Sequence, residues 1–406
     1  MILMDTISLY YHIPFCRHRC AYCDFNTYVK LEYLFDKYVQ ALCTEFTNNV
    51  NEVNERPKIK TIYFGGGTPT LLSTQHFQTI LANAHEHTTI PVDTEITIEA
   101  NPGITSFTYL KNLRQLGINR ISFGVQSANP KELQLLDRQH TYTDVIQSVY
   151  YARKAGFENI NLDLIFGIPD QTLIDWQRSL KLAQDLNPEH FSLYELSIER
   201  GTPLCKYYSK GLFSPPDQDL AASKYEWASE FLSKNNYTQY EISNWARSDT
   251  DDQKPNSRTW LCKHNLQYWH NLEYLGIGAG AHSFANDKRT VNYLSPIKYI
   301  KSLHEPPSRI KNVGFPNTRA TEIVNEINRE TEIGETMMMG LRLTQIGVSK
   351  KIFQDRFDQS MEEIYGKKIN HFIRLGLLEW AGKNQDILRL TTKGRLLGNQ
   401  VFMEFI

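Results

Sequence analysis

The sequence predicts an α/β protein whose main sheet is parallel. Short apolar, β-rich runs alternate with longer segments whose apolar residues recur at the 3.6-residue period of a helix. Because each connection between successive runs is long enough to hold a helix, we expect the runs to pair in parallel. An open doubly wound sheet and a partial barrel both fit, and both gather functional groups at the carboxyl ends of the strands. The predicted strands are residues 8–13, 61–64, 95–99, 120–125, 159–166 and 190–196.

A smaller α+β domain is predicted at the C-terminus. Residues 304–318 carry three prolines and a glycine, which favours a domain boundary. A helical region follows, and then two strand-like runs, 377–381 and 387–391, flank a Gly-Lys-Asn-Gln-Asp turn. A hairpin between helices is typical of a winged helix. We therefore expect an α/β core at 1–200, an extension at 201–314 and a winged-helix-like domain at 315–406.

Composition and charge restrict the classes of partner. The chain has 406 residues, with 44 Lys and Arg against 45 Asp and Glu, a formal net charge of −1. This balance argues against nucleic acid as a partner. The apolar start lacks the basic residues of a secretory signal, and no run approaches the length of a membrane span. We expect a cytoplasmic protein with no integral membrane segment.

Three of the six cysteines, Cys16, Cys20 and Cys23, lie in a CxxxCxxC pattern directly after the first predicted strand. Clustered thiols in a reducing compartment indicate a metal or redox site. Each could hold one iron of a cubane, which would leave the fourth iron open to another molecule. A zinc site with His18 as the fourth ligand is the alternative. Heme attachment of the c type is disfavoured because Asp24, and not a histidine, follows Cys23.

Other residues suited to ligand binding follow the next strands. The second strand runs into a triple-glycine turn, 65–67, where backbone groups can approach a ligand closely. A plain tight turn remains the alternative there, whereas a phosphate loop is excluded because GxxxxGK[ST] is absent. Glu99 and Gln126 end the third and fourth strands, Arg138 is expected on the following helix, and Asp163 lies in the fifth strand.

The cysteine pattern followed by the glycine turn resembles the radical SAM superfamily. The longer match over 10–25, YxHIPFCxxxCxYCDF, resembles the oxygen-independent coproporphyrinogen III oxidase branch and, within it, the HemW-type heme chaperones. The resemblance implies a partial (β/α)6 barrel in residues 1–200 and a [4Fe–4S] cluster held by Cys16, Cys20 and Cys23. It also implies S-adenosylmethionine chelated to the open iron, where a reduced cluster can cleave the sulfonium to a 5′-deoxyadenosyl radical.

The resemblance also implies which residues contact S-adenosylmethionine. Carboxylates suit its cationic ammonium and sulfonium, an arginine suits its carboxylate, and polar side chains suit its ribose hydroxyls. Taken singly, several of these residues have ordinary structural alternatives, such as a surface ion pair for Arg138. The implied contacts are Gly66, Gly67, Thr68, Glu99, Gln126, Arg138 and Asp163, with Tyr10 and Tyr22 as aromatic neighbours of the cluster.

Three features favour the chaperones over the oxidases. Phe25 stands where the oxidase pattern has a fourth cysteine, and only nine residues precede Tyr10, too few for the oxidases' N-terminal arm. Residues 264–269 match the HNxxYW motif associated with HemW. Its His264 could ligate heme iron, with Tyr268 and Trp269 beside the porphyrin, although a core histidine, His270 or Cys262 are alternatives.

The sequence therefore predicts a heme chaperone that passes heme to an acceptor protein. Oxidative decarboxylation of coproporphyrinogen III is the main alternative, and a radical enzyme acting on an unrelated substrate is the third. No catalytic residue is assigned.

Overall fold

The computed structural model describes residues 6–53, 56–248, 260–304 and 314–406. The chain forms two compact units. Unit 1 comprises Met1–Ala228 and Glu273–Glu326, and unit 2 comprises Ser229–Leu272 and Ile327–Ile406. The three-segment division remains a prediction, and the proposed boundary at 304–318 lies largely outside the described residues.

Unit 1 is built on a sheet whose central strands are parallel. All six predicted strands are confirmed, and their ends shift by no more than three residues. They pair in parallel in the order β1-β4-β5-β6-β7-β8. Their bounds are β1 Thr6–Ile13, β4 Lys58–Gly66, β5 Glu95–Ala100, β6 Arg120–Gln126, β7 Asn159–Phe166 and β8 His190–Glu195, with a short pair formed by β2 Phe15–Cys16 and β3 Tyr28–Val29.

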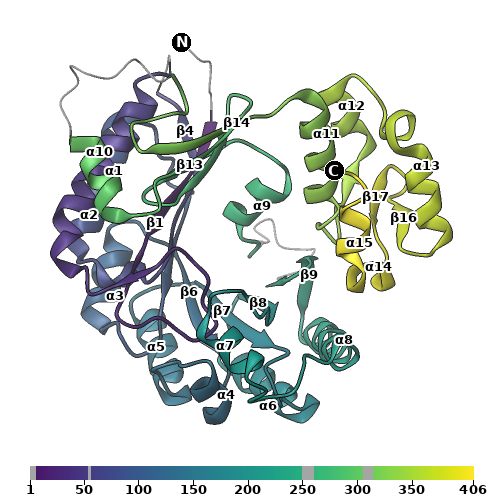
Figure 1. The fold of residues 1–406 in the computed structure, drawn as a ribbon, viewed down its shortest axis with the longest axis horizontal. Helices are drawn as coiled ribbons and strands as arrows, with labels where there is room; N and C mark the ends of the chain where they lie inside the picture. Colours follow the sequence, from purple (N-terminus) through teal and green to yellow (C-terminus); the bar gives the residue numbers. More distant parts are fainter. Residues whose placement is uncertain (1–5, 54–55, 249–259, 305–313) are drawn as a thin grey trace. The chain divides into compact units, whose positions relative to one another are not determined.

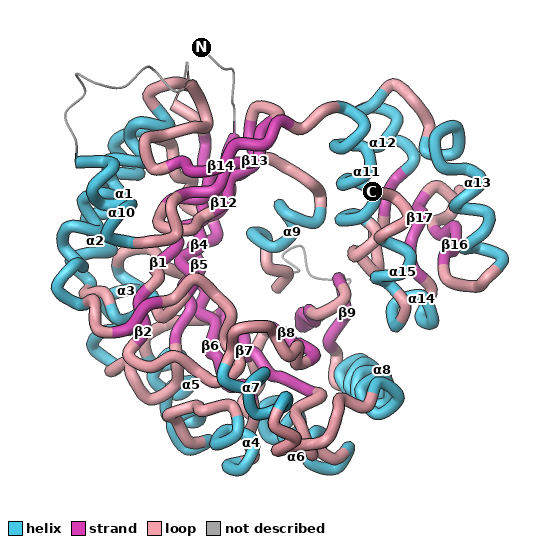
Figure 2. Tube along the Cα trace, viewed as in Figure 1, coloured by secondary structure: helices cyan, strands magenta, loops and turns pink. Residues whose placement is uncertain are grey.

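The helices of unit 1 line the outer face of this sheet, which curves into a partial barrel (Figures 1 and 2). On β1, Ile7, Leu9, Tyr11 and Ile13 are at most 1% exposed, as expected for a strand covered by helices. The helices are α1 Phe35–Val50, α2 Thr74–His87, α3 Phe107–Gln115, α4 Pro130–Leu135, α5 Tyr142–Lys154, α6 Leu173–Gln184, α7 Pro203–Ser209, α8 Gln218–Lys234, which continues into unit 2, and α10 Pro296–His304, with 3-10 turns η1 Glu32–Leu34 and η2 Pro69–Leu71.

The sheet also extends beyond β1 through strands from much later in the sequence. β11 (Tyr274–Ile277) pairs with β1 in parallel, and β12 (His282–Ala285), β13 (Lys288–Asn292) and β14 (Thr321–Glu326) continue antiparallel. Gly276 permits the close approach of β11 to β12. A Cβ on Gly276 would lie 2.0 Å from the His282 carbonyl oxygen.

Replacing Gly276 by Ala is expected to destabilise unit 1 by about 3 kcal/mol or more, because the added methyl group would overlap backbone that cannot move away cheaply. Urea titration followed by circular dichroism measures the change. Gly366→Ala is the matched control. Gly366 lies in helix α13 with nothing within 4 Å of an added Cβ, so the same substitution should stabilise slightly. Equal behaviour of the two variants would contradict the assigned packing of β11 against β12.

Unit 2 contains the predicted winged-helix-like domain. Its three-stranded sheet has the order β15-β17-β16, and its core includes Met337, Leu341, Phe353 and Leu388. The elements are β9 Tyr237–Glu241, β10 Asn244–Arg247, α9 Lys263–Trp269, α11 Arg329–Gly340, β15 Val348–Ser349, α12 Lys350–Phe357, α13 Met361–Arg374, β16 Leu378–Ala381, β17 Ile387–Leu390, α14 Thr392–Leu396 and α15 Gly398–Phe402.

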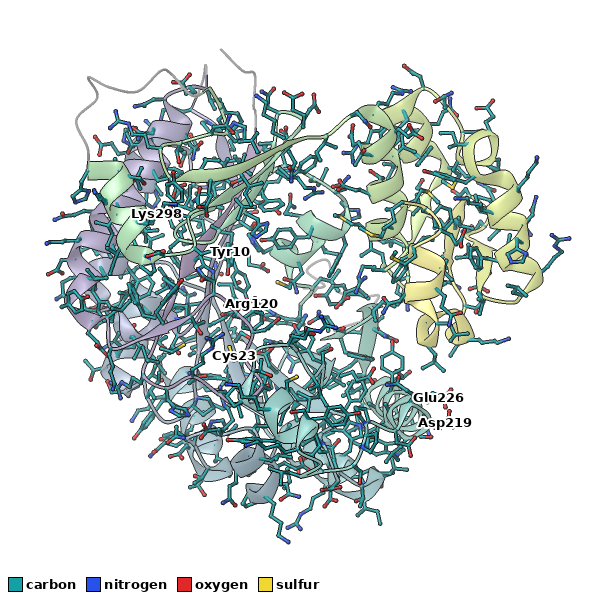
Figure 3. All side chains as sticks on the ribbon, viewed as in Figure 1. Tyr10, Cys23, Arg120, Asp219, Glu226 and Lys298 are labelled. Atoms are coloured by element: carbon teal, nitrogen blue, oxygen red, sulfur yellow. The ribbon has the colours of Figure 1, made fainter. Side chains whose placement is uncertain are left out.

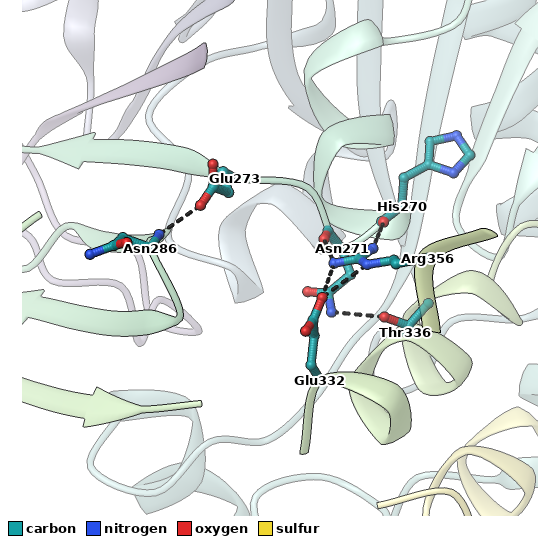
Figure 4. A network of polar contacts seen from close by, with 7 residues as sticks. All are labelled: His270, Asn271, Glu273, Asn286, Glu332, Thr336 and Arg356. Carbon is teal, nitrogen blue, oxygen red and sulfur yellow. Dashed lines mark hydrogen bonds and ion pairs between the residues drawn. The ribbon is translucent and has the colours of Figure 1, made fainter. Parts of the chain in front are cut away.

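Arg356 fixes the end of α9 within unit 2 (Figure 4). Its guanidinium donates to the backbone carbonyls of His270 (3.3 Å) and Asn271 (2.9 Å) and pairs with Glu332 at 2.6 Å. These bonds satisfy carbonyls that the helix end leaves without an intrahelical partner. Among the described residues, no helix combines the length and the apolar character that crossing a membrane would require.

Candidate functional site

Polar side chains line the inner face of the unit 1 sheet. Because side chains alternate along a strand, the apolar outward residues leave every second position for the interior. The strand register brings these positions side by side, so that the interior is a continuous polar layer. From β1 to β8 the matched residues are Ser8, Tyr10 and His12; Thr61 and Tyr63; Thr97 and Glu99; Arg120 and Ser122; Asn161 and Asp163; and His190 and Ser192.

The cysteine loop follows the carboxyl end of β1. Cys16 is the second residue of β2, which begins directly after Pro14. All three cysteines of the motif are half-buried, and Figure 3 labels Cys23 together with Tyr10 and Arg120. Burial raises the pKa of the Cys16 thiol to about 11, and burial also raises that of Cys23. Ligation by metal requires the thiolates, so loading this loop would release protons.

The glycine turn at the end of β4 packs directly against that loop. A Cβ on Gly67 would lie 2.6 Å from the Phe15 carbonyl oxygen and 2.9 Å from Cys16 Sγ, and one on Gly66 would lie 2.6 Å from the His12 ring. Gly66 also has φ +113°, a conformation that favours glycine. The turn is therefore more than a plain reversal, because only glycines allow it to approach the cysteines so closely.

Glu99 is a half-buried carboxylate on β5. Its Oε1 accepts from Tyr63 Oη at 2.9 Å, and its Oε2 accepts from the Gly66 backbone N–H at 3.0 Å. Burial, and after it the charge of Asp163, raises the pKa of Glu99 to about 7. A cationic group placed beside these two carboxyls would stabilise their ionised forms.

Arg138 lies in the loop after α4, which ends at Leu135, so the prediction of a helical position was wrong. The preceding Asp137 has φ +57°, which turns the chain out of the helix. Arg138 is no surface ion pair. It donates to the Gly124 carbonyl at 2.6 Å, to Asn101 Oδ1 at 2.7 Å and to Cys20 Sγ at 3.5 Å.

Asp163 lies on β7 and takes part in a buried network. It accepts from Ser122 Oγ at 2.9 Å and from Asn161 Nδ2 at 2.7 Å, and burial raises its pKa. Asn161 Oδ1 in turn contacts His190 Nδ1 at 2.5 Å. Asp163 is thus a half-buried, hydrogen-bonded acid, and its position beside Glu99 also suits a ligand.

The remaining predicted contacts border the same space. Gln126 ends β6 with φ +65°, and its amide nitrogen would lie 2.8 Å from a Cβ on Gly124. The Tyr10 hydroxyl hydrogen-bonds His12 Nδ1 at 3.0 Å, and its ring stacks on Tyr63. Tyr22 packs against an apolar cluster that includes Leu136, Ile165 and Ile168.

These residues fit an anionic and a cationic group bound together beside the thiols. Arg138 Nε is buried and has no hydrogen-bond partner within the described part of the chain, as a donor awaiting a carboxylate would be. The carboxyl groups of Glu99 and Asp163 would stabilise a positively charged group bound beside them. The donor set thus suits the sulfur-ligated cluster and the zwitterionic S-adenosylmethionine that the sequence motifs imply.

The alternative of a zinc site requires His18 as the fourth ligand, and the position of His18 does not support that role. Its Nε2 lies 2.7 Å from Asp137 Oδ2 in a half-exposed pair. Within the described residues, no three His, Cys, Asp or Glu side chains converge where they could hold one metal ion. A single zinc needs such convergence, whereas a cubane takes each cysteine on a separate iron.

His264 lies on α9 in unit 2 and is 1% exposed. Its Nε2 lies 2.9 Å from Tyr268 Oη, one turn further along the helix. Trp269 packs under the Arg342 guanidinium, 5.0 Å from the ring centre. Ligation of heme iron by His264 Nε2 would require the bond to Tyr268 to open.

The sequence argument missed several residues of this site. Asn101, His12, Arg120 and Asn161 all stand among its hydrogen bonds or in its polar layer. The signal that could have found most of them is the period-two alternation of polar residues within the predicted strands, as in Ser8-Leu-Tyr10-Tyr-His12. Asn101 lies one residue beyond β5, so only its place after Glu99 could have singled it out.

Comparison with known proteins agrees with the arrangement. Residues 10–183 match the Radical SAM superfamily and residues 327–397 match the HemN C-terminal domain. The chain is 38% identical to "Heme chaperone HemW" of Bacillus subtilis, over 98% of this chain and 99% of that protein. It is 39% identical to "Heme chaperone HemW" of Escherichia coli, over the full length of both.

A solved structure shares the fold. Coproporphyrinogen III oxidase (HemN) from Escherichia coli, described as a radical SAM enzyme, superposes with a TM-score of 0.81 over 99% of this chain and 90% of that chain, at 23% identity. Similarity at this identity concerns the fold alone, and it supports the predicted partial barrel with its C-terminal domain. The full-length sequence relationships are closer, and by them this chain belongs to the HemW family of the radical SAM superfamily.

Proposed function

We propose that this protein is a heme chaperone that carries a [4Fe–4S] cluster with S-adenosylmethionine and transfers heme to an acceptor protein. The observation that carries the proposal is the full-length identity of 38–39% to two proteins named heme chaperones. Phe25 supports it, since a 62% exposed phenylalanine stands where the oxidase pattern has a cysteine.

Within this function, Cys16, Cys20 and Cys23 would ligate three irons of the cluster, which supplies electrons for cleavage of S-adenosylmethionine when both are bound. Arg138 Nε would hold the carboxylate, and Glu99 and Asp163 would face the positive charges. The glycine turn with Thr68 would admit the methionyl end between β4 and the cysteine loop. Gln126, Tyr10 and Tyr22 would complete the walls.

Heme titration of anaerobically reconstituted protein, with and without S-adenosylmethionine, tests the proposal. We expect a Soret band that saturates at about one heme per chain, and no decarboxylation of added coproporphyrinogen III. Transfer is followed by loss of that band on addition of an apo heme protein. Rapid decarboxylation to protoporphyrinogen would show instead that the chain is an oxidase, and absence of heme binding would overturn the chaperone assignment.

We propose His264 as the heme ligand, and its substitution tests this separately. His264→Ala should shift the Soret maximum or weaken heme binding about tenfold, because the axial imidazole is lost. His270→Ala serves as the control at a neighbouring imidazole. A normal spectrum in the first variant and an altered one in the second would move the assignment to His270.

Binding of S-adenosylmethionine should weaken as the pH falls below about 7. Glu99, whose pKa is raised to about 7, must be ionised to stabilise a cation, so a cationic ligand lowers this pKa and binds in competition with the proton. Below the pKa the affinity should fall by up to about tenfold per pH unit. Equilibrium dialysis between pH 6 and 8.5 measures this. Glu99→Gln gives the baseline, because it keeps all other titrations, and identical slopes would remove Glu99 from the site.

A further inference from the structure

A chain of hydrogen bonds connects two of the three motif cysteines. Starting from Cys20, it passes through Arg138, Asn101 and Thr68 and ends at Cys16. Residues on three separate elements supply it: the loop after α4, the residue following β5 and the turn after β4. Asn101 is the central member, and neither the sequence motifs nor the comparisons assign it a role.

The first half of the chain ends at Cys16. Asn101 Nδ2 donates to Thr68 Oγ1 at 3.0 Å, and the Thr68 hydroxyl donates to Cys16 Sγ at 3.6 Å. Thr68 is 3% exposed, so its hydroxyl has little access to water. Because the amide already occupies an acceptor lone pair of the hydroxyl, the hydroxyl hydrogen is directed at the sulfur.

The second half ends at Cys20. Arg138 Nη2 donates to Asn101 Oδ1 at 2.7 Å, while Nη1 of the same guanidinium donates to Cys20 Sγ at 3.5 Å. Gly124 leaves room for this contact. A Cβ there would lie 3.2 Å from Arg138 Nη2 and 3.4 Å from Asn101 Oδ1. Both ends of the Asn101 amide are thus used, one for each branch.

We propose that Asn101 is a positioning residue that aims both Thr68 and Arg138 at the cysteine sulfurs, and thereby sets the reduction potential of the cluster and the placement of S-adenosylmethionine. The inference rests on the proposed cluster site. Hydrogen bonds to ligand sulfurs withdraw charge from them and favour the reduced, more negative cluster. The Arg138 guanidinium, which Asn101 positions, can also donate from its Nε to the carboxylate of S-adenosylmethionine.

Two measurements on reconstituted protein test the role of Asn101, and neither depends on heme. Asn101→Ala should shift the cluster's midpoint potential to more negative values in an anaerobic redox titration, and it should raise the Kd for S-adenosylmethionine about tenfold. Asn83→Ala is the matched control. Asn83 Nδ2 donates to Thr47 Oγ1 at the same 3.0 Å, but it does so between α2 and α1, far from the cysteine loop in sequence. It should leave both values unchanged.

A second pair of variants separates positioning from a general loss of structure. Thr68→Val removes the donor to Cys16 together with the acceptor for Asn101 Nδ2 and should shift the potential in the same direction, whereas Thr68→Ser keeps the hydroxyl and should restore it. If the Asn101→Ala variant does not retain its cluster, the two Thr68 variants test the inference in its place. Wild-type potential and Kd in Asn101→Ala, or in Thr68→Val, would overturn the inference. Failure of the wild-type chain to hold a cluster would instead refute the proposed cluster site, and normal cluster behaviour without heme binding would refute only the chaperone.

Discussion

Replacing Cys20 by Ser is expected to remove nearly all iron and inorganic sulfide from the anaerobically reconstituted protein, at least about a tenfold reduction. A cubane held by three protein thiolates has no ligand to spare, and the remaining two leave two irons exposed to solvent and chelators. The histidine of the loop between β1 and β3, His18, is paired with Asp137. Iron and sulfide analysis with the visible absorption spectrum measures the loss.

Two further variants make this result specific. Cys43→Ser removes a half-buried thiol from α1, outside the motif, and should retain the full iron and sulfide content. His18→Ala distinguishes the metals: a cubane should be unaffected, whereas a zinc site with three cysteines and one histidine would lose its metal. Wild-type protein with stoichiometric zinc and no sulfide would contradict the cluster, as would a Cys20→Ser variant with normal iron and sulfide.

The central strands could be predicted because burial on both faces leaves a strong local signal. β1, β4 and β7 are short runs rich in apolar residues between helical segments, and such runs mark strands of a parallel sheet. The residues at their carboxyl ends could therefore be grouped before the structure was known. Arg138 shows where this prediction from local pattern fails. A turn at Asp137 places Arg138 in a loop and not in the expected helix, although its side chain still reaches the site.

The extension of the sheet could not be predicted in the same way. β11 lies more than 200 residues from its partner β1, and a four-residue strand beside a glycine-rich run has no period that distinguishes it from a turn. The pairing of β11 with β1 depends on packing between distant segments, which a local pattern does not contain.

Glu45 illustrates a signal that the sequence does carry. It falls on the same face of α1 as Tyr38, Leu42 and Asn49, at the spacing of buried helix positions. In the structure its carboxyl accepts from the Gly278 N–H (2.9 Å), Asn292 Nδ2 (2.6 Å), Tyr299 Oη (2.5 Å) and Thr318 Oγ1 (3.4 Å). One helix residue thus binds together the loops and the helix of the sheet extension.

Glu45→Ala is therefore expected to destabilise unit 1 by about 4 kcal/mol, since several buried donors lose their acceptor at about 1–3 kcal/mol each. Amide hydrogen exchange should accelerate most at Gly278, which loses its partner directly. Thr44→Ala, at the neighbouring, only partly buried position of α1, should change stability by less than about 0.5 kcal/mol. Equal unfolding midpoints for the two variants would show that the network contributes little.

The pH dependence of this loss follows from the protonation of Glu45. Burial raises its pKa to about 7, from an ordinary value of 4.5, although the four donors oppose the shift. The folded chain therefore holds a proton that the unfolded chain releases between pH 4.5 and 7. The contribution of Glu45 to stability is fully present below pH 4.5 and declines as the pH rises through 7, by up to about 3 kcal/mol. Denaturant titrations at pH 5 and pH 8 should accordingly show a larger difference between wild type and Glu45→Ala at pH 5, and a larger difference at pH 8 would mean that the carboxyl is already ionised in the folded chain at pH 5.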